Sequence, residues 1–225
     1  MPKIKVSGFY PAMIVALALG LAKPAQADTI TVFTNLGLGG SFNTLQGWDV
    51  DGGITGAQAI ADAFTPSLTT MLSSAELALG LNLGSGSVNV YIESDSAGLP
   101  GVIIATLIQQ GSLGGFPPGA LVDFTCTACP LLEAGVQYWL VAQVSDPSTA
   151  IEWNWNSTGD TSAANFAFNN SASPEGPWTI ASGDTRSAFD IQGAGTPEPA
   201  SFLLFGAGLV ALAGVVWHKK LQRLL

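Results

Sequence analysis

The sequence predicts an all-β fold, an antiparallel β-sandwich or jelly-roll-like domain. Some ten short stretches alternate apolar and polar residues or are rich in β-branched residues, whereas helical periodicity is almost absent. Clusters of Gly, Pro, Asn, Asp and Ser separate these stretches at intervals of roughly 8–12 residues, the spacing of turns in sandwich folds. The length of the chain between its two ends suits one domain with a hydrophobic core.

The expected strands carry β-branched or aromatic residues and lie between turn-forming clusters. Residues 29–34 form the first strand, and a Gly-rich loop follows, with residues 48–53 at its far side. Further strands are expected at residues 59–64, 75–83, 88–93, 102–108, 121–125, 136–144 and 151–156, and around 166, 178–181 and 188–191. Residues 136–144 are the most continuous apolar stretch, so we expect that strand to be central.

Residues 73–83 fit two patterns. Ser73 and Glu76 have the spacing of a capping box, which begins helices. Against a helix, apolar residues recur at every second position from Ala75 to Leu83, and Gly80 would weaken a helix interior. We therefore expect a strand.

Both ends of the chain have the features of targeting segments. Lys3 and Lys5 precede an apolar stretch, and Ala25 and Ala27 form an A-x-A cleavage site, which indicates a secretory signal peptide over residues 1–27. The alternative is an uncleaved N-terminal helix, for which the apolar stretch is short. The expected organisation is this signal peptide, an extracellular β-sandwich domain over 28–193 (here called the body), and a tail over 194–225.

The tail has three parts in order: Pro197, Glu198 and Pro199, then an apolar run over 200–217, then a basic end. As a helix, the 18-residue run would reach about 27 Å, close to the roughly 30 Å of a bilayer's hydrocarbon core. The basic end predicts a cytoplasmic C-terminus and a body on the outer side of the membrane.

This order closely resembles the PEP-CTERM sorting tail of exported bacterial proteins. The resemblance implies that an exosortase, a membrane-embedded enzyme similar to cysteine transpeptidases, recognises the tail and removes it. The alternative is an ordinary tail anchor in which the Pro-Glu-Pro triplet occurs by chance.

Several stretches of the body are similar to the extracellular domains called choice-of-anchor, particularly the R type. They are residues 64–66, 93–101, 138–141 and 155–160. The resemblance implies a β-rich fold and a surface location, and it brings no catalytic residues.

The body is strongly acidic. It holds fifteen of the sixteen acidic residues and one basic residue, Arg186, which gives a net charge of −14. Nucleic acids and anionic lipids both require a basic surface, so the charge excludes them as partners. Calcium stays compatible, and Asp49 and Asp51 have the spacing of two early calcium-loop ligands, but the rest of that motif is absent and a Gly-rich turn is the favoured interpretation.

The residue types of the body exclude most catalytic chemistry. The only histidine, His218, lies in the tail, and residues 28–193 contain no lysine. This excludes histidine acid–base catalysis, Ser–His and Cys–His nucleophiles and His-ligated zinc. A pair of carboxylates could still hydrolyse a glycosidic bond, with Glu93, Asp95, Glu152 and Asp160 as candidates. No pattern pairs any two of them, so we expect no enzyme and no cofactor.

Cys126 and Cys129 have thioredoxin-like spacing. Residues 130–135 leave barely one helical turn before the next strand, whereas a redox cysteine sits at a helix N-terminus. Two cysteines in an exported chain favour a structural disulfide, with free thiols and a redox pair as alternatives.

Trp153 and Trp155 are the best candidates for ligand binding. Two apart on one strand, they could form a stacking platform for sugar rings. Ile151 continues the same face, however, which favours a place in the core.

The sequence therefore predicts an exported, non-enzymatic protein, sorted by an exosortase to the cell surface or an exopolysaccharide matrix, with a structural or adhesive role. The alternatives are a module that binds extracellular glycan or calcium, and an extracellular glycan hydrolase.

Overall fold

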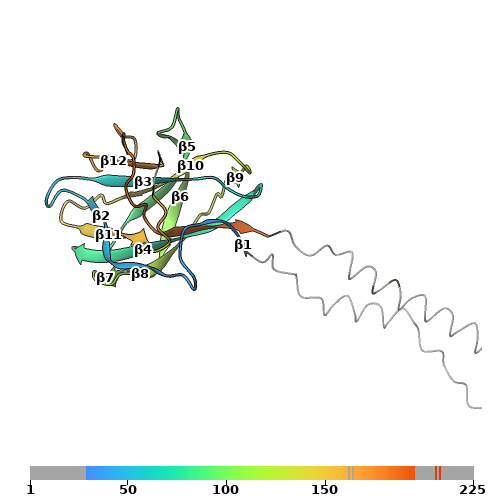
Figure 1. Ribbon diagram of the computed structural model, residues 1–225, viewed down its shortest axis with the longest axis horizontal. Coiled ribbons are helices and arrows are strands. Elements are labelled where there is room, and N and C mark those ends of the chain that lie inside the picture. The colour runs from blue at the N-terminus through green and yellow to red at the C-terminus, as the bar shows by residue number, and fades with distance from the viewer. Residues whose placement is uncertain (1–28, 162, 164, 196–205, 207, 209–225) are drawn as a thin grey trace, which may run out of the picture. The chain divides into compact units, whose positions relative to one another are not determined.

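The computed structural model describes residues 29–161, 163, 165–195, 206 and 208, and within them residues Thr29–Ala194 form one compact unit (Figure 1). Its elements are all strands: β1 Thr29–Thr34, β2 Phe42–Asp51, β3 Ala59–Phe64, β4 Thr70–Leu83, β5 Asn89–Asp95, β6 Pro100–Gln110, β7 Gly114–Gly115, β8 Ala120–Thr125, β9 Leu131–Leu132, β10 Tyr138–Gln143, β11 Ala150–Asn156, β12 Phe166–Asn169, β13 Thr179–Ala181 and β14 Phe189–Ala194. The prediction of an all-β fold is confirmed.

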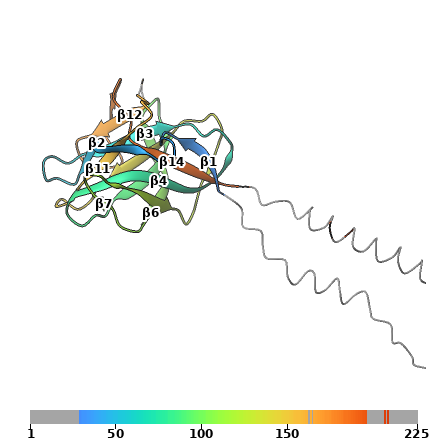
Figure 2. The same ribbon diagram turned by 60° about the horizontal axis from the view of Figure 1, so that its bottom comes forward.

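The strands form one continuous sheet that curls over at β6 into two leaves (Figure 2). The first leaf has the order β1-β14-β4-β8, with β11, β2, β7 and β9 attached through β4 and β11. The second has the order β5-β10-β3-β12-β13, and β6 pairs with β8 of one leaf and β5 of the other. All pairs are antiparallel except β4 with β7, so short turns suffice to connect many of the strands.

The main core lies between the leaves. Each strand that contributes to it points every second side chain inward, as the period of two requires. Leu77 and Leu79 of β4 pack in this way in the same cluster as Ile60 of β3, Ile92 of β5 and Leu140 of β10. Because these strands lie far apart in sequence, the core closes only when both leaves are formed.

The segment at residues 73–83 is a strand, as predicted. β4 is the longest strand, with 14 residues, and it pairs with β14, β8, β11, β7 and β9. Gly80 is accommodated because a Cβ there would lie 2.6 Å from Cβ of Phe116, so the glycine allows the chain at 116 to approach closely.

The prediction of a loop up to residue 53 is wrong in its second half, because Phe42–Asp51 forms β2. This strand pairs with β11, from Ala150 opposite Asp51 to Asn156 opposite Phe42. Gly47 lies opposite Asn154, and a Cβ there would come within 2.4 Å of the Trp153 carbonyl oxygen. Gly47 thus permits close packing of the two strands.

The predicted central strand is confirmed: β10 lies between β5 and β3, and all six of its residues are buried. Its outward-facing residues Trp139 and Val141 belong to a second, smaller apolar cluster on the outer face of the second leaf. Trp178 and Ile180 pack against this cluster, so the segment around β13 covers β10 from outside.

Arg186, the body's only basic residue, is 4% exposed. Its guanidinium pairs with Asp62 of β3 and with Asp160, and it donates a further hydrogen bond to the Ala63 carbonyl oxygen. The rings of Phe33 and Phe189 lie against it. The arginine therefore stabilises the interior of the fold. As a result, the described surface of the body has no basic side chain.

The predicted signal peptide, the Pro-Glu-Pro triplet, nearly all of the apolar run and the basic end lie outside the described residues. Within the part that the structure describes, no helix has both the length and the apolar character needed to cross a membrane.

Candidate functional site

Trp153, the first candidate of the proposed sugar platform, is fully buried between the leaves. Its ring centroid lies 6.0 Å from that of Phe189, and its Nε1 donates to the Ala188 carbonyl oxygen at 3.0 Å. Trp155 is partly exposed but packs against Trp48, with 5.3 Å between ring centroids. These two tryptophans therefore present no common exposed face, which favours the core interpretation.

The asparagines that flank these tryptophans also serve the fold. Asn154 is buried and donates to the carbonyl oxygens of Asn43 and Pro118. Asn156 donates to the carbonyl oxygens of Asp160 and Arg186 and accepts backbone hydrogen bonds from Thr158 and Asp160. Both side chains are buried and their Nδ2 groups bind backbone carbonyl oxygens, so neither amide is presented to a ligand at the surface.

Asp51 shapes the turn that follows β2. Its carboxylate accepts hydrogen bonds from the backbone N–H groups of Gly53, Ile54 and Thr55 and from the Thr55 hydroxyl. Burial alone would raise its pKa, but these hydrogen bonds outweigh it and lower the pKa to about 2. The Gly-rich turn is thus what the structure shows at this position, with the carboxylate occupied by its own loop.

Asp49 pairs instead with Glu152, which lies directly opposite it on β11. Nδ2 of Asn82 donates a hydrogen bond to Oε2 of Glu152 at 3.4 Å. Burial and the neighbouring Asp49 charge raise the pKa of Glu152 to about 7. Among the described residues, no third His, Cys, Asp or Glu joins them to form a metal-binding group.

Glu93 lies on the outer face of β5, opposite to the side on which Val90 and Ile92 enter the main core, and this alternation would by itself leave the face exposed to solvent. The second apolar cluster covers this face instead, and Glu93 is 0% exposed. Neither of its carboxyl oxygens has a hydrogen-bond partner among the described residues, and Nε1 of Trp178 is likewise buried without a partner there. Burial, together with the charge of Glu175, raises the pKa of Glu93 to about 8, so the carboxyl is uncharged at neutral pH.

The two remaining carboxylate candidates have structural partners. Asp95 accepts hydrogen bonds from Nε1 of Trp139 at 2.9 Å, from Gln137 and from the backbone N–H of Gly98. Asp160 pairs with Arg186 at 2.9 Å. None of the four candidates is thus an exposed carboxylate without a partner: Glu93 is covered, Asp95 and Asp160 accept hydrogen bonds or pair with Arg186, and Glu152 faces Asp49.

Cys126 and Cys129 form a disulfide, as predicted. The bond closes the loop between β8 and β9, and both cysteines pack against the main core. The free-thiol alternative does not hold in this structure. No helix follows Cys129, since β9 begins two residues later, so the loop lacks the helix dipole that lowers the pKa of a redox cysteine.

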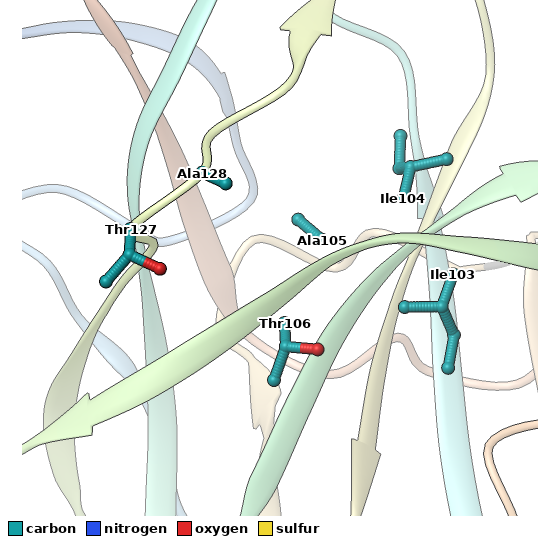
Figure 3. Close-up of a pocket in the computed structure, with 6 residues that line it drawn as sticks. All are labelled: Ile103, Ile104, Ala105, Thr106, Thr127 and Ala128. Atoms are coloured by element: carbon teal, nitrogen blue, oxygen red, sulfur yellow. The ribbon is translucent and has the colours of Figure 1, made fainter.

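A shallow pocket lies between β6 and this disulfide loop (Figure 3). Its lining is apolar apart from two threonines: Ile103, Ile104, Ala105, Thr106, Thr127 and Ala128. No acid, base or metal ligand stands among these six residues, so the pocket offers hydroxyl groups and apolar surface but no group for catalysis.

Sequence reasoning missed the Asp49–Glu152 pair and the cover over Glu93. Both depend on contacts between distant segments: β2 with β11 in the first case, and the segment around Trp178 with β10 in the second. The run Pro174 to Trp178, with its two prolines, reads as an ordinary loop, and no local pattern indicates that it covers a strand.

The comparison with known families identifies the PEP-CTERM protein-sorting motif at residues 196–220. The predicted Pro197, Glu198 and Pro199 fall inside this match, and the predicted PEP-CTERM tail is confirmed. The motif implies an exported protein that an exosortase sorts to the cell surface or beyond. No curated protein and no solved structure matches the chain, so the similarity of the body to choice-of-anchor domains stays an expectation.

Proposed function

We propose that the chain is an envelope protein that its tail first holds in the membrane and that an exosortase then cuts at or near Pro197-Glu198-Pro199. The body is thereby released or transferred to the cell surface or an extracellular polysaccharide matrix, where it has a structural or adhesive role. The single observation that carries the proposal is the sorting motif at 196–220.

The two prolines of the triplet support a cleavage site. Two prolines around Glu198 disfavour a helix there and keep the backbone extended. An extended segment just outside the bilayer suits the groove of a processing enzyme, which binds substrates as strands. The apolar run over 200–217 and the basic end need no such triplet to anchor a protein, so the triplet has a separate purpose.

The arrangement of side chains in the body supports a role without catalysis. Hydrolysis of a glycosidic bond needs two carboxyl groups about 5–10 Å apart, with a sugar between them. Asp49 and Glu152 instead lie directly opposite each other on adjacent strands, so they stand side by side on one face of the sheet and not on opposite sides of a sugar-binding cleft. Glu93 is enclosed under apolar side chains. Trp153, one of the two sugar-platform candidates, and Asp51, one of the two calcium candidates, are buried, which weighs against either binding site.

The experiment replaces Pro197, Glu198 and Pro199 by Ala in the producing cell. Export and membrane insertion should be unchanged, whereas the full-length protein should accumulate in the membrane fraction and disappear from the surface and the medium. Intact-mass measurement of each fraction identifies the species. The double variant Pro174→Ala/Glu175→Ala removes the same residue types from the body and should be processed like the wild type.

Deleting the host's exosortase should trap the same full-length species. A mature wild-type protein that still carries residues 200–225 would show that the tail is a plain anchor, and the proposal would fail.

A further inference from the structure

Four exposed apolar side chains gather at one end of the body. Met71 and Leu131 lie directly opposite each other in the pair of β4 with β9, and Leu68 and Val136 stand at the ends of the same two segments. The backbone N–H of Gly135 donates to the Pro66 carbonyl oxygen and that of Ala134 to the Thr69 hydroxyl, which fastens the segments together. These four residues, 41–53% exposed, are called the apolar end patch below.

The chain leaves the body beside this patch. Thr29 and Ala194 are opposite each other in the β1–β14 pair, so both ends of the body emerge together. The Thr70 hydroxyl, next to Met71, donates to the Ala194 carbonyl oxygen at 2.7 Å. Both views place the label of β1 at the opposite side of the body from that of β7 (Figures 1 and 2). The patch therefore lies at the end of the body to which the sorting tail is attached.

The length of the connection ties this end to the bilayer, if the tail spans it as proposed above. The apolar run begins at Ala200, six residues after Ala194, and six residues extend over at most about 20 Å. An anchored body therefore cannot hold its tail end farther than this from the hydrocarbon core. The polar headgroup layer takes up part of that distance.

Because the body lacks exposed basic side chains, apolar contact is the attraction that it can make with a lipid surface. Arg186 is buried, so the described surface of the body offers no basic group to an anionic headgroup. Glu133, between Leu131 and Val136, is exposed and adds a negative charge at the patch. Apolar side chains at the headgroup boundary bind through buried area, without need of a basic residue.

We propose that the apolar end patch rests on the lipid surface while the chain is anchored, which holds the body upright over the membrane with its tail end down. The inference depends on the proposed membrane anchoring by the tail. It adds a partner, the outer lipid surface, for a face of the body that no family match covers.

The test uses the full chain reconstituted into phosphatidylcholine vesicles. Both native cysteines are in the disulfide, so a single introduced cysteine can carry an environment-sensitive fluorophore. Met71→Cys places it in the patch, and Leu83→Cys places it on the same strand, twelve residues or about 40 Å away. Lipids brominated on the upper acyl chain should quench the fluorophore at position 71 and leave that at 83 unquenched.

A second substitution checks that the patch itself makes the contact. Leu131→Asp should abolish the quenching at position 71, because it places a charge opposite the label. Leu38→Asp, at an equally apolar but distant loop residue, should leave the quenching unchanged. Leu38 lies beyond the end of β1 that is remote from Thr29.

The outcomes separate the inference from the proposed function. Resistance of the protein to carbonate extraction reports anchoring on its own. An anchored protein with equal, low quenching at 71 and 83 overturns the lipid contact and leaves the anchor intact, whereas an extractable protein overturns both. The emission of the fluorophore at position 71 also reports whether water reaches it. If the emission shows exclusion of water without brominated lipid, and this exclusion disappears at one protein per vesicle, a second copy of the chain covers the patch and the lipid contact is overturned.

Discussion

Nε of Arg186 lies 3.1 Å from Oδ1 of Asp62, and the two side chains are almost completely removed from solvent. The backbone N–H of Ser187 donates to the other oxygen of the same carboxylate at 3.1 Å. Burial raises the pKa of Asp62 to about 6, against the opposing effects of the Arg186 charge and of the hydrogen bond from the Ser187 backbone N–H. The pair joins β3 of one leaf to the segment that enters β14 of the other.

Arg186→Met should destabilise the body by roughly 3–5 kcal/mol, because it leaves Asp62 buried without its cation. The loss should be smaller at pH 5 than at pH 8, since a protonated Asp62 carries no charge to compensate. Urea denaturation at the two pH values measures this. The double variant Arg186→Met/Asp62→Leu should recover much of the stability at pH 8. A single variant as stable as the wild type at pH 8 would contradict the expectation.

Trp153→Ala should lower the free energy of unfolding by about 3–5 kcal/mol, because it removes a large, fully enclosed ring from the core. The melting temperature should fall sharply. Leu38→Ala, at a fully exposed side chain, is the control and should change stability by less than about 0.5 kcal/mol. An unchanged melting curve for Trp153→Ala, together with lost glycan binding, would instead support the sugar platform.

Glu93 should make the body less stable as pH rises. Its pKa is about 8 in the folded chain, above the ordinary value of 4.5 for a glutamate in an unfolded chain. Between these values the folded state binds more protons than the unfolded state, so the stability contributed by protonated Glu93 is full below about pH 4.5 and is lost as pH rises through about 8. Glu93→Gln should therefore be roughly 2–4 kcal/mol more stable than the wild type at pH 8, with the difference vanishing near pH 4.

Denaturant midpoints at pH 4, 6 and 8 measure this dependence. Glu133→Gln alters an exposed glutamate and serves as the matched control, expected to follow the wild-type curve. A constant difference between Glu93→Gln and the wild type over the whole range would assign the effect to packing and not to the proton.

The disulfide should act as a local clip. Cys126 and Cys129 enclose a very short loop. A disulfide stabilises the fold by lowering the conformational entropy of the unfolded chain, and for so short a loop this effect is worth about 2 kcal/mol at most. The double variant Cys126→Ser/Cys129→Ser should thus fold, with a modestly lower melting temperature. The native protein should resist alkylation until it is reduced and should not catalyse insulin reduction. Rapid labelling of the oxidised, folded protein would contradict this.

Alternating patterns predicted most of the fold, because apolar residues at every second position of a half-buried strand identify the side that faces the core. The strand at β4 followed from apolar residues at every second position despite a capping-box pattern. β2 was missed because Leu45, Gln46 and Gly47 show no such alternation. The strand is largely exposed, and it forms by pairing with β11, which follows about a hundred residues later in the sequence.

At the candidate site, too, local patterns predicted some features, whereas others depend on contacts between distant segments. Ile151 on the strand of Trp153 indicated a core face, and the burial of Trp153 agrees with it. Glu93 alternated with apolar residues as a solvent-facing acid would, and only the packing of Trp178 and Ile180 over β10 reveals that it is covered. The sorting tail needed no structure, because an ordered series of local features is itself the signal that an enzyme reads.

The burial of Arg186 also affects how readily trypsin-like proteases can cleave the exported body. Trypsin-like enzymes cut after lysine or arginine, and residues 28–193 contain one such bond, after Arg186. The side chain that the protease must take into its specificity pocket is held inside the sandwich by Asp62, Asp160 and two phenylalanine rings. An extracellular trypsin-like protease therefore finds no accessible cleavage site in the folded body, and digestion at this single bond reports that the two leaves have come apart.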